Sequence, residues 1–438
     1  MNNGLKEQYL IVRSFAKSLV FIAPIAIITG LTVALFLWLL EEVTLIRWHN
    51  MWLIFLLPIA GVFISLLYKN FGKGTEGGNN LIIVEAYNDV IPSDKKGIPL
   101  LMAPLILITT VITHLFGGSA GREGTAVQIG GSIASFLSKK FKVSEEEKRI
   151  FIMSGIAAGF GAVFGTPVAG AIFALEVITI GKIKYDALMP CLMASIIADM
   201  ACSLCGIKHT KYLIVHKSFE PTLFYNISFD VMLLVKVAVA GIIFGLAAYL
   251  FTLISDFIKA KGNFYIKTKW LIPVFGAILV IGISYLLGTF DYLGLGVNSQ
   301  SENGISIVSA FKSGGADDFS WFWKLLLTAI TLSTGFKGGE VTPLFFIGAT
   351  LGNTFAVICG GPVDLFAGLG FVAVFAAATN TPFASIIMGL ELFGTEYVLY
   401  FSVACIFAYY FSGHKGIYNA QKVSVSKMIG KNNVEDEK

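Results

Sequence analysis

Charged residues are scarce in this sequence of 438 residues. Asp, Glu, Lys and Arg together make up 14% of it, whereas 55% of the residues are hydrophobic and the mean hydropathy is +0.77. An average soluble protein is about 25% charged. The deficit excludes an ordinary soluble domain and predicts an integral membrane protein.

Cysteine and histidine are also rare, with five of each. The cysteines have no regular spacing, and the single CxxC, Cys202 to Cys205, lacks a second pair, so we expect no disulfide framework, no metal site and no cofactor. His209, His216 and His414 fall in loop or tail segments, which argues against a membrane-embedded enzyme. The sequence has no P-loop and nothing that suggests binding to nucleic acid.

Long apolar runs take up much of the chain. They are 18–40, 52–68, 100–116, 231–254, 271–287 and 397–411. Several are long enough to cross about 30 Å of hydrocarbon as a helix, so we expect an all-α polytopic protein in contact with a lipid bilayer. Lys and Arg crowd both termini, which predicts that both ends lie in the cytoplasm.

One glycine-rich passage occurs twice. GREGT at 121–125 returns loosely as GGEVTP at 338–343, and 165–176 returns as 380–391. Glycine breaks at matching places in two halves point to the ion site of a transporter. We therefore divide the chain into a first half with an amphipathic lead-in (1–206), a connecting loop (207–228), a second half (229–412) and a tail (413–438).

The glycine breaks at 72–80, 121–125 and 338–343 suit an anion. A glycine cluster before an apolar helix leaves free N–H groups at a helix N-terminus, and these groups attract negative charge. The dipole of one helix N-terminus stabilises an anion by about 0.3–2 kcal/mol. This is far less than the cost of burying a bare anion. We therefore expect several breaks to converge on one site built mainly from neutral donors.

Two acids stand in these breaks. A charge at bilayer depth costs about 2.5–3.5 kcal/mol on insertion scales, so Glu123 is a functional candidate; the alternative is a structural carboxylate paired with Arg122. Glu340 occupies the matching point of the second half, with Lys337 as its alternative partner. If the carboxyl groups of Glu123 and Glu340 are buried near each other, burial and like charge would raise the pKa of at least one of them. A raised pKa would allow that carboxyl group to carry a proton at neutral pH.

Other polar residues have simpler alternatives. Thr342 could donate a hydroxyl or merely cap a helix, and Asn79 could donate its amide or merely favour a turn. Glu176 and Glu391 end matched helices, where hydrogen-bonded helix-end acids are the simpler interpretation. Tyr418 begins an expected helix in the tail, where an interfacial tyrosine is the alternative.

Taken together, these motifs resemble the CLC family of chloride channels and anion/proton antiporters. The segment 121–125 is similar to its GREGP motif, 338–343 to its GxFxP motif, and 78–81 stands where GSGIP would be; Tyr418 matches the tyrosine of the final helix. The resemblance implies a bundle of about 18 helices, many broken or tilted, in two inverted halves. It also implies a homodimer with one anion path in each subunit.

The resemblance assigns roles to specific residues. Glu123 would be the gating glutamate, and Glu340 would couple proton and anion movement. The implied anion-binding residues are Asn79, Gly121, Arg122, Val341, Thr342 and Tyr418.

Four departures from the family pattern indicate which branch of the family this chain resembles. Asn79 replaces the serine of chloride-selective members, Thr125 replaces a proline, an acid stands at Glu340, and Val177 stands where many antiporters have an inner proton glutamate. These changes look like the bacterial fluoride-exporting branch. We therefore expect a fluoride/proton antiporter of the bacterial plasma membrane. A chloride/proton antiporter or a passive chloride channel of the same fold remains the alternative.

Overall fold

The structure is a computed structural model that describes residues 3–87, 97–216 and 230–427. Within these residues the first half of the chain forms eight α-helices. They are α1 (Asn3–His49), α2 (Leu57–Phe71), α3 (Asn79–Tyr87), α4 (Met102–Leu115), α5 (Glu123–Phe141), α6 (Glu145–Phe164), α7 (Pro167–Glu176) and α8 (Leu188–Leu204). Short 3-10 turns, η1 (Met51–Leu56) and η2 (Tyr185–Ala187), precede α2 and α8.

The second half adds seven described α-helices. They are α9 (Val231–Tyr265), α10 (Ile272–Leu287), α11 (Ser320–Ser333), α12 (Val341–Cys359), α13 (Val363–Thr379), α14 (Pro382–Phe393) and α15 (Val398–Phe411). The 3-10 turns here are η3 (Lys269–Leu271), η4 (Ser309–Phe311) and η5 (Thr395–Tyr397). The only described strands are β1 (Thr179–Ile180) and β2 (Lys422–Val423). The expected mostly helical fold is confirmed.

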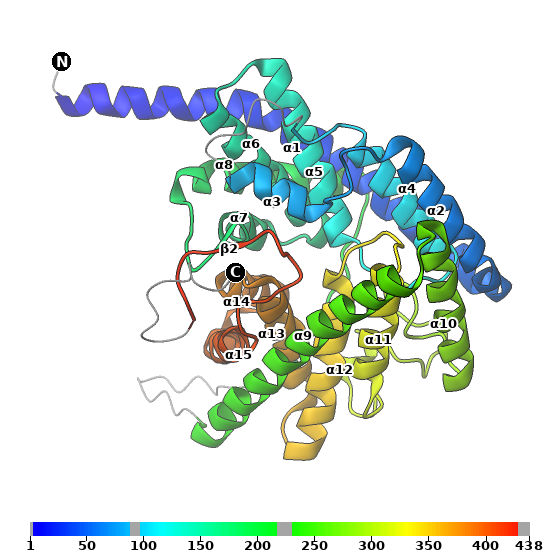
Figure 1. Cartoon of the computed structure of the whole chain (residues 1–438). Helices are drawn as coiled ribbons and strands as arrows, with labels where there is room; N and C mark the ends of the chain where they lie inside the picture. The colour runs from blue at the N-terminus through cyan, green and yellow to red at the C-terminus, as the bar shows by residue number, and fades with distance from the viewer. Residues whose placement is uncertain (1–2, 88–96, 217–229, 428–438) are drawn as a thin grey trace.

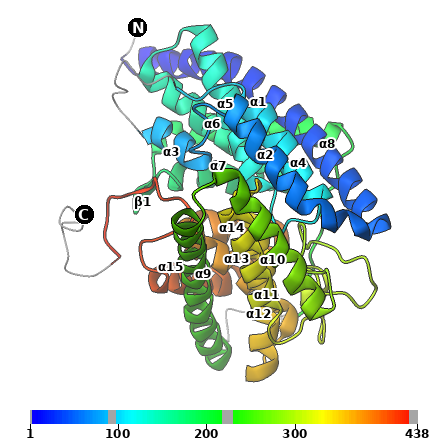
Figure 2. The same cartoon turned by 45° about the vertical axis from the view of Figure 1, so that its right-hand side comes forward.

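The helices of the two halves form neighbouring groups (Figures 1 and 2). Among the described residues, six helical stretches are long and apolar enough to cross a membrane. They are Lys6–His49, Met51–Phe71, Tyr185–Leu204, Val231–Tyr265, Lys269–Leu287 and Val341–Cys359. In the described residues the lead-in from residue 3 is continuous with the first apolar run, since both belong to α1.

Matched glycines bring helices into backbone contact in each half. A Cβ on Gly130 of α5 would lie 2.0 Å from the carbonyl oxygen of Gly155 on α6. In the second half, a Cβ on Gly348 of α12 would lie 2.0 Å from the carbonyl oxygen of Gly370 on α13. Because no side chain separates the backbones, the two helices of each pair pack closely against each other.

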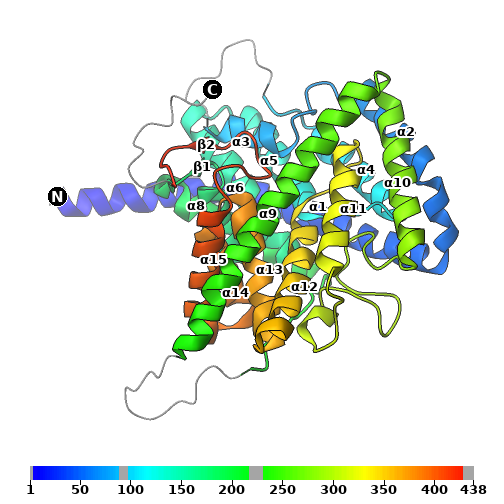
Figure 3. The ribbon, with the colours of Figure 1, turned by 60° about the horizontal axis from the view of Figure 1, so that its bottom comes forward.

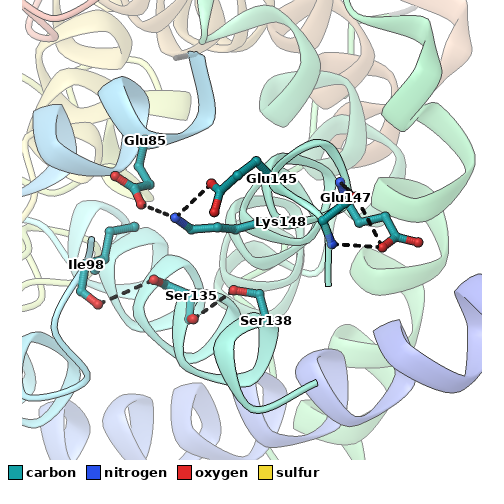
Figure 4. A network of polar contacts seen from close by, with 8 residues as sticks. Glu85, Ile98, Ser135, Ser138, Glu145, Glu147 and Lys148 are labelled. Carbon is teal, nitrogen blue, oxygen red and sulfur yellow. Dashed lines mark hydrogen bonds and ion pairs between the residues drawn. The ribbon is translucent and has the colours of Figure 1, made fainter. Parts of the chain in front are cut away.

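A buried ion pair fixes α3 against the start of α6 (Figure 4). Lys148 Nζ lies 2.7 Å from Glu85 Oε1 and 3.3 Å from Glu145 Oε2. Ser144 and Glu147 form the capping box that begins α6. Since Asn79 begins α3 and Glu85 lies near its end, this pair orients the helix that carries a candidate site residue.

The C-terminal segment returns to the first half (Figure 3), where β2 pairs in parallel with β1. The helix expected at Tyr418 is wrong, because residues 413–427 are turns and extended chain apart from the short β2. Side-chain bonds hold this segment in place: Ala420 N donates to Asn80 Oδ1 (2.9 Å), and Gln421 Nε2 donates to the Val177 carbonyl (2.9 Å). These bonds replace the backbone bonds of a helix.

The division of the chain into two halves remains a prediction. Parts of the expected loop (217–228) and of the tail (428–438) lie outside the described residues. The described helices on either side of the loop end at Leu204 and begin at Val231.

Candidate functional site

The glycine breaks of the two halves cross at Gly121 and Gly339. Gly121 N donates to the Gly339 carbonyl (2.6 Å) and Gly339 N donates to the Gly121 carbonyl (2.8 Å), which forms an isolated antiparallel bridge. A Cβ on Gly339 would lie 2.7 Å from the Gly124 nitrogen, so only glycine allows this approach. The crossing places the N-termini of α5 and α12 at one point.

The Glu123 side chain spans this crossing. Its Oε2 accepts the N–H of Thr342 (2.9 Å) and of Arg122 (3.1 Å), and its Oε1 accepts the Thr342 hydroxyl (2.5 Å). Arg122 Nε lies 3.5 Å from Oε1, and Glu123 is 1% exposed. The carboxylate thus occupies donors that would serve an anion equally well. The Arg122 partnership considered from the sequence is also present.

A cavity of about 160 Å³ is lined by Asn79, Glu340 and Tyr418. A Cβ on Gly124 would lie 2.8 Å from Asn79 Nδ2 and 3.8 Å from Glu340 Oε2, so both polar groups lie next to Gly124 in the first turn of α5. Asn79 is 9% exposed and Tyr418 is 4% exposed. Burial raises the pKa of Tyr418 well above its usual value, with the charges of Glu340 and Glu123 adding to the effect, so its phenol remains a hydrogen-bond donor.

Two further candidate residues lie next to the crossing of Gly121 and Gly339. Val341 and Thr342 are the first two residues of α12 and are 1% and 3% exposed. Lys337, the alternative partner of Glu340, lies with its Nζ 4.3 Å from the centre of the Tyr68 ring. The Thr125 hydroxyl bonds to that of Thr110 at 2.9 Å.

A pocket of about 20 Å³ lies against Glu123 and Thr342, and no residue lines both it and the cavity of Asn79. His209 and Tyr212 line this pocket, although the sequence suggested only a linking loop there. Burial and the charge of Arg122 lower the pKa of His209 from 6.5 to about 4, so its imidazole is neutral at physiological pH. The local sequence around His209 gives no signal that its side chain lies beside Glu123.

The family model described as "Voltage gated chloride channel" matches residues 60–413. The chain belongs to the CLC family. It is therefore a multi-pass membrane protein of a transport family and not an enzyme, and the resemblance inferred from the motifs is confirmed.

Several known members of the CLC family resemble this chain closely. A "Chloride/fluoride channel protein" of Pseudomonas syringae pv. tomato is 43% identical over 96% of this chain and 90% of its own length. The crystal structure of a CLC-type fluoride/proton antiporter superposes with a TM-score of 0.84 at 35% identity, covering 93% of this chain and 98% of that one. A slow cyanobacterial Cl⁻/H⁺ antiporter shares the fold, with a TM-score of 0.72 at 20% identity over 92% of this chain and 96% of its own.

Proposed function

We propose that this CLC protein is a secondary active transporter that exports fluoride in exchange for protons. The observation that carries the proposal is the placement of Glu123, whose carboxylate accepts three hydrogen bonds at the joined N-termini of α5 and α12. A protonated carboxyl would leave these donors, and an anion would take its place. One group thereby exchanges a proton and an anion at the same donors.

Two of the three similar proteins support fluoride as the transported anion. One is named for chloride and fluoride and the other is a fluoride/proton antiporter. Asn79 and Thr342 supply an amide and a hydroxyl close to the crossing, and a small, hard anion requires strong donors at short range. Glu340, whose carboxylate lies on the same side of Gly124 as the Gly339 backbone, would assist the proton step in place of the glutamate that Val177 replaces.

The proposed assignments for the other candidate residues follow the same geometry. Gly121 and Arg122 contribute backbone to the crossing, Val341 begins α12, and Tyr418 closes the cavity of Asn79. Each is proposed to frame the anion path. We propose no metal or organic cofactor.

We place the protein in the bacterial plasma membrane with both termini in the cytoplasm, following the lysine-rich ends of the chain. The inward proton gradient would then drive fluoride out. We also propose a homodimer with one anion path in each subunit. Photobleaching of singly labelled subunits in lipid should give two steps, whereas single-step records would refute the dimer.

The deciding experiment measures fluoride-driven proton movement in liposomes that contain the purified protein. Glu123→Gln should abolish proton-coupled turnover, because the amide cannot exchange a proton at neutral pH. Unchanged coupling in this variant would remove Glu123 from its proposed role. Glu146→Gln, an exposed acid at the start of α6, is the matched control and should transport as the wild type does.

The name of the first relative also mentions chloride and a channel, so a chloride/proton antiporter or a passive chloride channel is the second candidate. Efflux of chloride and fluoride from the same liposome preparation separates the ions. Equal rates would refute fluoride selectivity. Absence of proton movement against a gradient would instead indicate a passive channel.

A further inference from the structure

The C-terminal segment (413–427) carries Tyr418 to the cavity of Asn79 and Glu340. Apart from the short β2, this segment consists of turns and extended chain, so no helix holds the phenol in place. Contacts with other parts of the protein must therefore position Tyr418. Several of these contacts begin at Lys427.

Lys427 is a buried cation in a shell of oxygen atoms. It is 8% exposed, and its Nζ donates to Asn380 Oδ1 (2.7 Å), the Tyr409 carbonyl (2.6 Å), Ser412 Oγ (3.3 Å) and the Gly413 carbonyl. An ammonium group has three N–H donors and no acceptor, so this shell fits the charged form of the side chain. Burial lowers the pKa of Lys427 from 10.5 to about 7, and hydrogen bonds to the ammonium oppose that shift.

The oxygen atoms of the shell lie at the ends of two helices. Asn380 is the C-cap of α13, and Ser412 is the C-cap of α15. Carbonyl groups at a helix C-terminus carry partial negative charge, which stabilises a cation placed there. The ring of Tyr409 also faces the ammonium, with its centre 3.7 Å from Nζ. Lys427 thereby joins the ends of α13 and α15.

Lys427 also closes the C-terminal segment into a loop. Its backbone N–H donates to His414 Nε2 (2.9 Å), while its Nζ bonds to the Gly413 carbonyl. The two ends of the segment are therefore joined, and Tyr418 lies between them. Loss of the ammonium would release one end of this loop.

Hydrogen bonds connect the lysine to the backbone of Tyr418. Asn380 accepts from Lys427 through Oδ1 and donates through Nδ2 to Gln421 Oε1 (3.2 Å). Gln421 Nε2 donates to the Thr379 carbonyl (2.8 Å), and the Gln421 N–H donates to the Tyr418 carbonyl (3.1 Å). The ammonium is thus linked through two side chains to the residue that lines the cavity.

We propose that Lys427 is a positioning residue, which closes the C-terminal segment and so holds the phenol of Tyr418 at the cavity of Asn79 and Glu340. The inference rests on the proposed anion path, which includes Tyr418. Lys427 is not among the described residues that line this cavity, so it acts on the anion only through Tyr418. Without the ammonium the phenol is no longer held at one place, and fluoride loses a fixed donor.

A double-mutant cycle on fluoride-driven proton flux in liposomes tests this inference. Lys427→Met removes the charge from a side chain of similar length and should raise the KM for fluoride about tenfold. A purely structural loss would reduce the amount of active protein, and therefore the maximal flux, but would leave KM unchanged. A wild-type KM in Lys427→Met would overturn the proposal.

The second arm of the cycle is Tyr418→Phe. This variant should also raise KM, and adding Lys427→Met to it should change KM no further, because the lysine acts through the phenol. Effects that multiply in the double variant would show that Lys427 acts independently of Tyr418 and would overturn the proposal.

Lys422→Met is the matched control. Lys422 is an exposed lysine of the same segment, and its Nζ lies 3.8 Å from the centre of the Tyr87 ring. Its removal takes away the same charge but leaves the shell of oxygen atoms around Lys427 intact. We expect the wild-type KM in this variant.

Asn380→Gly is a milder variant that decides the matter if Lys427→Met fails to fold. Asn380 has a left-handed backbone with φ of 57°, which glycine adopts without strain, so the change removes only side-chain bonds. It breaks the link between Lys427 and Gln421 and should raise KM about threefold. A wild-type KM in Asn380→Gly would overturn the proposal.

A measurement without transport separates this inference from the proposed antiport. Fluorotyrosine would be incorporated at position 418 of the full-length protein in lipid nanodiscs and observed by fluorine NMR. Its resonance should shift or broaden in Lys427→Met and in Asn380→Gly but not in Lys422→Met. An unchanged resonance would overturn the positioning role, whereas a shifted resonance in a protein without fluoride flux would refute only the antiport.

Discussion

Glu176 and Glu391 cap each other's helices. Glu176, at the end of α7, accepts the N–H groups of residues 383–384 at the start of α14 (3.1 and 2.8 Å). Glu391, near the end of α14, accepts those of residues 168–169 at the start of α7 (3.0 and 2.8 Å). The two helices therefore run in opposite directions and are joined by equivalent bonds, which is a local two-fold relationship between the halves.

Burial predicts unequal losses from the two sides. Glu176→Gln leaves one backbone N–H facing an amide NH₂ at a residue that is 5% exposed, which should cost about 1–3 kcal/mol. Glu391 is exposed, so Glu391→Gln should cost less because water can satisfy the N–H. The apparent unfolding temperature in detergent checks this. Glu396→Gln, an exposed acid in η5, should leave that temperature unchanged, and a neutral result for Glu176→Gln would refute the capping role.

Gly339→Ala should disrupt the crossing of the two breaks. The new Cβ would meet the Gly124 nitrogen at 2.7 Å, and such overpacking typically costs about 1–3 kcal/mol. We expect a lower unfolding temperature together with loss of fluoride-driven proton flux. Gly282→Ala in α10 is the matched control, because nothing lies within 4 Å of its Cβ. Retained flux in Gly339→Ala would contradict the close approach.

Thr342→Val removes the hydroxyl that bonds to Glu123 Oε1 at 2.5 Å. A hydrogen bond to a charged group is worth about 1.5–3 kcal/mol, and both the carboxylate and an incoming anion would lose this donor. We therefore expect fluoride-driven proton flux in liposomes to fall about tenfold or more. Thr342→Ser keeps the hydroxyl and should retain most of the flux; equal flux in the two variants would refute the contribution of the hydroxyl.

The pair Lys148 and Glu85 should contribute more to stability than Lys148 and Glu145. Glu85→Gln removes the nearer partner (2.7 Å) of a side chain that is 8% exposed, and we expect a loss of about 2–3 kcal/mol. Glu145 is the longer contact at 3.3 Å and its side chain is 64% exposed, so Glu145→Gln should cost less than about 1 kcal/mol. Thermal unfolding of both variants checks the order, and a reversed order would refute it.

His209 makes the stability depend on pH at the acidic end. Its pKa falls from 6.5 to about 4 on folding because of burial and Arg122, so between these values the unfolded chain binds more protons. Stability contributed by the neutral ring is therefore full above pH 6.5 and is lost as pH falls toward 4, by about 1–3 kcal/mol. His209→Gln should flatten this part of the curve of unfolding temperature against pH. An unchanged slope would contradict the buried neutral state.

The sequence by itself determined the class of protein and the location of its breaks. Low charge and long apolar runs require a membrane environment, and the repeated Gly-Glu passages mark helix starts because glycine interrupts a helix and leaves N–H groups free. A different local rule marks the start of α6, because Ser144 followed by Glu147 is the sequence pattern of a capping box. Glu123 and Glu340 stood out because charge is expensive at membrane depth.

Only the tertiary structure decided which of these groups meet. The bonds between Glu123 and Thr342 join residues 219 positions apart, and the crossing of Gly121 with Gly339 depends on how the two halves dock. The same docking paired Thr125 with Thr110, extended the chain at Tyr418 and placed His209 in the pocket beside Glu123. Periodicity and spacing report local backbone preference, whereas contacts between distant segments depend on the shape and packing of the assembled helices.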